Sequence, residues 1–99
     1  MVRKGFGDIG QHVIGSYKMS AKRRRLSFKL DIKYLWKLYL KQNKRCALTN
    51  EELYFGTKGS NYRPIGGNAS LDRIDNMKGY IKGNVQWVTK DVNLCRRKL

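Results

Sequence analysis

Apolar side chains recur at helical spacing in the middle of the chain. They are Ile32, Leu35, Trp36 and Tyr39. Residues at these positions lie on one stripe of a helix, so the pattern predicts a helix running to about Asn43 with this stripe in the core. Asp31 stands directly before it and suits the N-cap, because its carboxylate can accept hydrogen bonds from the first free amides. Lysines form a separate basic stripe at 33, 37 and 41.

The C-terminal third has a different pattern. Short apolar-rich runs at 69–74 and 84–88 predict two strands, joined by a loop that ends at Gly83. Thr89 is a suitable N-cap for a last helix that runs toward Leu99. The order strand, loop, strand, helix places acidic and amide side chains where the elements meet.

The remaining segments are less regular. We expect a flexible basic arm over residues 1–15, a short helix over 16–25, and an extended segment over 26–30. A tight turn is predicted at Thr49-Asn50, and the Gly-rich stretch 56–68 is predicted to be a loop. Residues 16–99 would then form a single α+β domain.

The charge of the chain points to a polyanionic partner. Lys and Arg number 22 against 7 Asp and Glu, which gives a formal net charge of +15. Phosphates of a nucleic acid would relieve this self-repulsion. Solubility alone and an anionic membrane surface are the two alternatives.

Compartment and cysteine use add little. The first residues do not resemble a secretory signal, and lysines interrupt every apolar run before it could span a bilayer. We therefore expect a cytoplasmic protein with reduced thiols and no membrane partner. Two cysteines, Cys46 and Cys95, make no disulfide framework and leave a single bridge open, and we expect Cys95 to be buried or functionally neutral.

Oxygen-bearing side chains near the predicted hairpin suggest a cation site. Asp72 lies near the end of the first strand, and Asn93 lies one turn into the last helix. If that helix packs across the hairpin, the two side chains converge, and hard cations such as magnesium prefer oxygen ligands. Asn84 could brace the loop through its amide. The alternative is turn chemistry alone, above all at Asp75-Asn76.

Longer motifs make the pattern more specific. The core of small phage and bacterial HNH endonucleases, a branch of the His-Me finger nucleases, resembles the stretch SLDRIDNMKGYIKGNVQWVTKDVN. The segment before that core resembles KRRRLSFKLDIKYLWKLYLKQNKRCALTNEELYF, and together the likeness covers about residues 16–97. It implies a ββα-metal fold over about residues 69–99, preceded by one or two helices and docked at the DNA minor groove.

The resemblance also implies residue roles. Asp72 and Asn93 would hold one divalent cation, Mg²⁺ first and Mn²⁺ as a possibility, and Asn84 would fix the loop. Arg73 stands where the family places its general base. Because a guanidinium stays protonated, Arg73 is a poor base and would clamp the phosphate instead. Asp75 is a candidate auxiliary acid or base.

A second departure concerns zinc. Many HNH proteins carry two CxxC pairs, and here the four positions are Cys46, Thr49, Thr89 and Val92. One thiolate cannot make a tetrahedral site, so we predict no structural zinc, with packing by Leu48, Trp87, Val88 and Val92 in its place. Relatives often have a histidine at the position of Thr89.

The resulting hypothesis is a metal-dependent DNA endonuclease of phage or mobile-element type, a monomer or weak homodimer without a small-molecule cofactor. Its DNA contacts would come from Arg23, Arg24, Arg25, Lys78, Lys82, Lys90, Arg96 and Arg97. A second interpretation is a module of the same fold that binds nucleic acid and has lost cleavage. A third is a structural or ribosome-associated basic protein.

Overall fold

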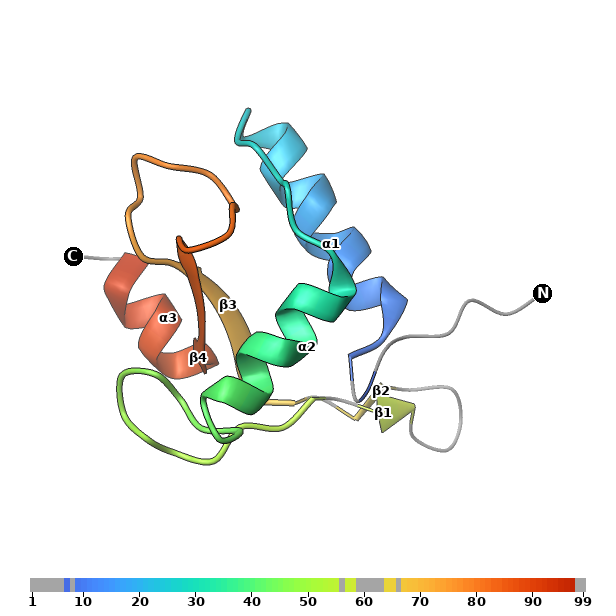
Figure 1. The fold of residues 1–99 in the computed structure, drawn as a ribbon, viewed down its shortest axis with the longest axis vertical. Helices are drawn as coiled ribbons and strands as arrows, with labels where there is room; N and C mark the ends of the chain where they lie inside the picture. Colours follow the sequence, from blue (N-terminus) through green and yellow to red (C-terminus); the bar gives the residue numbers. More distant parts are fainter. Residues whose placement is uncertain (1–6, 8, 56, 59–63, 66, 98–99) are drawn as a thin grey trace.

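The residues that the structure describes form three helices and two small antiparallel strand pairs, an α+β arrangement (Figure 1). The computed structural model describes residues 7, 9–55, 57–58, 64–65 and 67–97, with the pairs 57–58, 64–65 and 96–97 described by their backbone alone. The elements are α1 (Gln11–Arg23), α2 (Ile32–Lys41), β1 (Thr57–Lys58), β2 (Pro64–Ile65), β3 (Ala69–Arg73), β4 (Val85–Thr89) and α3 (Lys90–Arg97). In this described part of the chain, no helix is long and apolar enough to cross a lipid bilayer.

The predicted order of strand, loop, strand and helix is confirmed. β3 and β4 pair antiparallel with Leu71 opposite Trp87, and α3 begins directly after β4. The Thr89 side chain caps α3, since Thr89 Oγ1 accepts from the Val92 amide at 3.3 Å. Both strands and the start of the helix lie within one residue of where the sequence places them.

Helix α2 follows its sequence signals. Asp31 Oδ1 accepts from the Tyr34 amide at 2.7 Å, which confirms the predicted N-cap. The helix ends two residues before the expected limit, because Asn43 takes a left-handed conformation with φ of 56°. The Lys44 amide then reaches back to the Tyr39 carbonyl at 3.0 Å and closes the last turn.

Trp87 is at the centre of the core. Its side chain is fully buried between α2 and the hairpin, and its Nε1 donates to the Leu35 carbonyl at 3.0 Å. The Phe55 ring packs edge-on against the Trp87 ring, with 4.9 Å between the two ring centroids. The Gln42 side chain pairs with the Trp87 backbone like a neighbouring strand, accepting from its amide and donating to its carbonyl, both at 2.9 Å. α2 lies on one side of the hairpin and α3 on the other (Figure 1).

Helix α1 corrects the prediction for the N-terminal region. It begins at Gln11, and the flexible arm expected over residues 1–15 is wrong for residues 9–15. Ile9 and Ile14 are buried at 1% and 4% exposure, so apolar burial holds this stretch in place. The cap residue is Gly10, which has no side chain to accept a hydrogen bond from the first amides of the helix. The sequence therefore lacks the polar capping residue that would mark the start of α1. Residues 1–6 and 8 lie outside the described part.

Three smaller expectations are also wrong. The stretch 56–68 contains the two-residue pair β1–β2 where only a loop was expected. Leu48 is half exposed in the turn that follows Cys46, so it does not pack in the core as predicted. Cys95 is exposed, because Val92 and Asn93 occupy the inward face of α3 and Cys95 points away from that face.

Candidate active site

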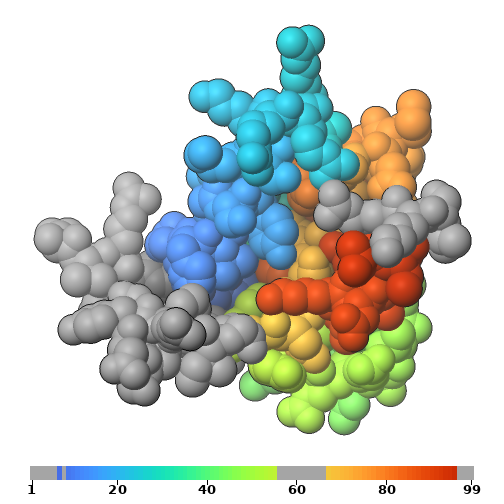
Figure 2. Space-filling model, turned by 180° about the vertical axis from the view of Figure 1, so that it is seen from behind, coloured from blue at the N-terminus to red at the C-terminus, as the bar shows by residue number. Residues whose placement is uncertain are grey.

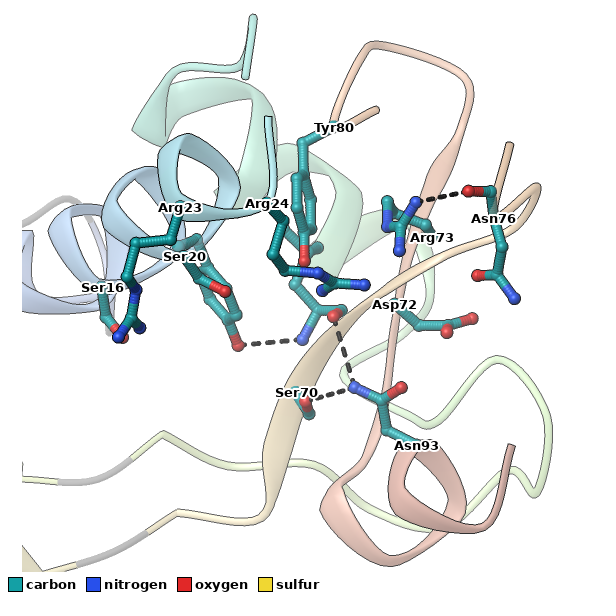
Figure 3. Close-up of a pocket in the computed structure, with 12 residues that line it drawn as sticks. Ser16, Ser20, Arg23, Arg24, Ser70, Asp72, Arg73, Asn76, Tyr80 and Asn93 are labelled. Atoms are coloured by element: carbon teal, nitrogen blue, oxygen red, sulfur yellow. Dashed lines mark hydrogen bonds between the residues drawn. The ribbon is translucent and has the colours of Figure 1, made fainter. Parts of the chain in front are cut away.

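A pocket of about 270 Å³ lies where α1, β3 and α3 meet (Figure 3). Its lining is mostly polar and comes from three separate parts of the chain. The lining residues are Ser16, Tyr17, Ser20, Arg23, Arg24, Ser70, Leu71, Asp72, Arg73, Asn76, Tyr80 and Asn93. Figure 2 shows this side of the molecule, with the blue surface of α1 and the red surface of α3 on either side of β3. Asp72, Arg73 and Asn93 are therefore brought to one pocket.

Asp72 is held on β3 by the strand opposite. Its side chain is 6% exposed, and its Oδ2 accepts from Gln86 Nε2 at 2.9 Å. Gln86 is the direct cross-strand partner of Asp72, so the register of the hairpin produces this contact. Asp72 shares its strand face with Ser70, two residues earlier.

Asn93 is oriented by β3. Its Nδ2 donates to Ser70 Oγ at 2.7 Å and to the Leu71 carbonyl at 3.4 Å. Because the amide nitrogen faces the strand, the Oδ1 atom points away from it, and no described residue donates to Oδ1. Figure 3 shows the Asn93 amide and the Asp72 carboxylate beside each other along β3.

This pair fits a hard divalent cation. A carboxylate and an amide oxygen are ligands of the kind that magnesium and manganese take in proteins, usually together with water and substrate phosphate. The Asn93 amide has its orientation fixed with the oxygen left open, which is the arrangement a ligand requires. The described residues contain no group of three or more His, Cys, Asp or Glu side chains that could hold a metal. The pair of Asp72 and Asn93 is a different kind of site, because it has one carboxylate and one amide.

Arg73 is anchored to the loop that follows β3. It is 8% exposed, and its Nη1 donates to the carbonyls of Asn76 and Lys78 at 2.7 and 3.0 Å. The guanidinium also lies 5.6 Å from the centre of the Tyr80 ring. Arg73 therefore lines the pocket while one of its nitrogens holds the turn at 76–78.

Asn84 braces the same loop, as the sequence predicts. The side chain is 6% exposed, its Oδ1 accepts from the Asp75 amide at 2.9 Å, and its Nδ2 donates to the carbonyls of Asp75 and Gly79 at 3.1 and 2.9 Å. Asp75 itself is exposed, its Oδ1 accepts from the Met77 amide, and it does not line the pocket. At Asp75 the turn interpretation is the one that the geometry favours.

The predicted DNA-binding residues separate into groups. Arg23 and Arg24 line the pocket, and Arg25 is exposed outside it. Three exposed lysines do not line the pocket either: Lys78, Lys82 and Lys90. Arg96 and Arg97 are in the last turn of α3, and their side chains lie outside the described part.

Tyr17 is a pocket residue that the sequence analysis missed. Its hydroxyl oxygen accepts from the Leu71 amide at 2.9 Å, and its ring packs against Trp87 and Tyr80. Burial raises the pKa of Tyr17 above its ordinary value, although the hydrogen bond from Leu71 opposes the rise. The phenol is therefore neutral at physiological pH. The spacing of Ile14, Tyr17 and Ala21 is the helical signal that could have found it.

The four positions that align with zinc ligands of the family form two hydrogen-bonded pairs, Cys46 with Thr49 and Thr89 with Val92. Cys46 Sγ accepts from the Thr49 amide at 3.4 Å, just as Thr89 Oγ1 accepts from Val92. Burial raises the pKa of Cys46, but hydrogen bonds from Thr49 and from the backbone of Leu48 and Thr89 outweigh it and leave the pKa lowered. Trp87 and Val88 are fully buried nearby, as predicted.

Comparison with known proteins gives one informative similarity. Over 77 residues the chain is 44% identical to an uncharacterized 29.0 kDa protein in the dda-modA intergenic region of Enterobacteria phage T4. The match covers 78% of this chain and 27% of the phage protein, so the chain spans about a quarter of that relative. No protein-family model matches the chain, and no solved structure matches it.

Proposed function

We propose that this protein is a metal-dependent DNA endonuclease with a ββα-metal core formed by β3, β4 and α3. The observation that carries the proposal is the meeting of Asp72 and Asn93 in one polar pocket, each oriented by a hydrogen bond to a neighbouring side chain. The resemblance of this stretch to HNH endonucleases supports the same assignment. The similarity to a phage protein agrees with a phage or mobile-element origin.

In this proposal the chain binds and orients the reacting groups. Asp72 and Asn93 would hold one divalent cation, Mg²⁺ first, and such an ion would supply Lewis-acid stabilisation of charge on the phosphate. Gln86 fixes the Asp72 carboxylate, and Ser70 fixes the Asn93 amide. In the hydrolysis, a water oxygen bonds to phosphorus and gives up one proton, one P–O ester bond breaks, and the leaving oxygen gains one proton, so that one water is consumed for each bond cut.

No side chain of the described lining is assigned as general base. The lining contains no histidine, and the raised pKa of Tyr17 keeps its proton in place. Arg73 is not assigned this role either, because a guanidinium is a poor base. The proposal therefore assigns binding and orientation to the side chains of the pocket, and it leaves Asp75 in the turn.

DNA is the proposed partner. The net charge of +15 would make binding strong at low salt and steeply weaker as salt rises, because each neutralised phosphate releases counterions. Sequence preference would be weak, since a small module makes few contacts to base edges.

Nicking of supercoiled plasmid by the purified chain tests the proposal. We expect nicking with Mg²⁺ or Mn²⁺, and its loss in Asp72→Ala and Asn93→Ala. The matched control is Asp91→Ala, which removes a carboxylate from the exposed first turn of α3, outside the pocket lining. If the Asp72→Ala and Asn93→Ala proteins nick as fast as Asp91→Ala, the site is assigned wrongly.

A second candidate is a nucleic-acid-binding module without cleavage. The observation in its favour is Arg73, which occupies the place of the family's base and is anchored by two backbone carbonyls. This candidate predicts salt-dependent DNA binding and no nicking in any metal. The plasmid assay separates the two candidates.

A further inference from the structure

The pocket has a second wall, contributed by a helix outside the hairpin–helix unit. Ser16, Ser20 and Arg23 recur at helical spacing on α1 and line the pocket together with Arg24. Figure 3 shows Arg24 extending from α1 toward the side of the pocket that holds Asp72 and Asn93. The hairpin–helix wall therefore offers the oxygen atoms of Asp72 and Asn93, and the α1 side adds two guanidinium groups.

The guanidinium groups of Arg23 and Arg24, at the end of α1, differ from that of Arg73 in their hydrogen bonding. No hydrogen bond or ion pair joins the Arg23 or Arg24 guanidinium to another described residue, and both side chains are exposed. Arg73 is buried and has one nitrogen engaged with two carbonyls. A guanidinium with free N–H groups can bind a phosphate through two parallel hydrogen bonds. An anion in the pocket would find these donors on α1.

The position of α1 relative to β3 is fixed. The Tyr17 hydroxyl accepts from the Leu71 amide, directly beside Asp72 in the strand. At the end of the helix, Arg25 takes a φ of 57°, and the Leu26 amide donates to the Ala21 carbonyl at 2.8 Å. This closure ends α1 sharply and sets where Arg23 and Arg24 leave the helix.

A simpler explanation for these arginines is the helix dipole, which favours any cation in the last turn. That explanation treats Lys22 and Arg23 alike. The pocket lining distinguishes the two residues, because it includes Arg23, together with Arg24, and does not include Lys22.

We propose that Arg23 and Arg24 bind the phosphate group that Asp72 and Asn93 face, so that α1 completes the active site. The inference rests on the proposed function for the identity of the reacting phosphate, but the phosphate contact itself does not require cleavage. Arg23 and Arg24 are then phosphate-binding residues, and Arg73 chiefly holds the loop.

The test uses the full chain with Arg23→Ala and Arg24→Ala against the control Lys22→Ala, which removes the same charge from the neighbouring turn position outside the pocket lining. Thermal unfolding comes first, and all three variants should unfold near the parent because these side chains are exposed. Affinity for a short fluorescent DNA duplex is then measured in EDTA over a salt series. Nicking with Mg²⁺ gives kcat and KM.

We expect each arginine variant to bind DNA about tenfold more weakly than Lys22→Ala and to show a salt slope lower by about 0.9, the value for one lost phosphate contact. Their kcat should fall further than that of Lys22→Ala. If the parent does not nick but the binding difference appears, the proposed function fails and the phosphate contact stands. If the arginine variants match Lys22→Ala in affinity, slope and kcat, the inference is overturned.

Discussion

Two asparagines of the same motif serve different purposes in this molecule. Asn84 uses its oxygen and its nitrogen on backbone groups of the loop 75–79, so its hydrogen bonding is spent on structure. Asn93 donates with its nitrogen only, and its oxygen is left toward the pocket beside Asp72. The difference teaches that residue type and spacing do not separate a structural brace from a candidate ligand, whereas the count of satisfied polar atoms does.

The largest effect on activity is expected at the pocket. Asp72→Ala or Asn93→Ala should lower the nicking rate by about a thousandfold, because several kcal/mol of transition-state stabilisation depend on the cation they would hold. Asn84→Ala, corrected for its folded fraction, should lose far less. Equal losses in Asn84→Ala and Asn93→Ala, measured on folded protein, would remove the distinction between brace and ligand.

The largest effect on stability is expected at the brace. Asn84→Ala removes a buried side chain that makes three hydrogen bonds to backbone groups of the loop 75–79, which should lower the free energy of unfolding by about 3 kcal/mol, roughly 1 kcal/mol for each bond. Urea unfolding measures it. Asn76→Ala, an exposed neighbour whose carbonyl rather than side chain is used, should change it by less than about 0.5 kcal/mol.

Gly79 is where the braced loop approaches the segment before α2. A Cβ added there would come within 2.7 Å of the Ser27 carbonyl oxygen, and Ser27 itself accepts from the Tyr80 amide. Gly79→Ala should therefore destabilise the fold by about 2 kcal/mol, since backbone must move. Gly15→Ala is the contrast, because its Cβ meets nothing within 4 Å on helix α1 and should stabilise by about 0.5–1 kcal/mol. If both substitutions shifted the unfolding temperature in the same direction, the result would contradict this account.

The smallest effect concerns pH. The folded-state pKa of Tyr17 is raised, so the native state favours the neutral phenol. The stability this contributes is complete below the unfolded pKa near 10 and is lost as pH rises from there through the folded value. Tyr17→Phe should flatten the alkaline fall in unfolding free energy while leaving its slope at neutral pH unchanged. An unaltered alkaline slope would show that Tyr17 is not the group responsible.

Local signals explain which parts of the fold were predictable. The Asp31 cap, the α2 stripe, the hairpin and the Thr89 cap each have a short-range cause in the sequence, and each is confirmed. Helix α1 was missed at its start because Gly10 gives no capping signal and glycines hide the apolar spacing of Ile9 and Ile14.

The site was predictable only in part, because its contacts span long stretches of chain. Asp72 and Asn93 were found from their place in the hairpin–helix order and from the resemblance. The contact of Gln86 with Asp72 depends on strand register, so it could not be read from the neighbours of Gln86 in sequence. Helical spacing indicates an inward-facing Tyr17, but its contact with Leu71 depends on how α1 packs. The anchoring of Arg73 by two carbonyls likewise follows from the turn that it closes.

The most direct test of the central claim is a titration of the chain with Mn²⁺ in the absence of DNA. The electron paramagnetic resonance signal of the free ion measures how much Mn²⁺ is bound. The account predicts one bound Mn²⁺ in the parent and in Asp91→Ala, and a large loss of binding in Asp72→Ala and in Asn93→Ala. Binding that survives both pocket substitutions unchanged would contradict a cation held between Asp72 and Asn93.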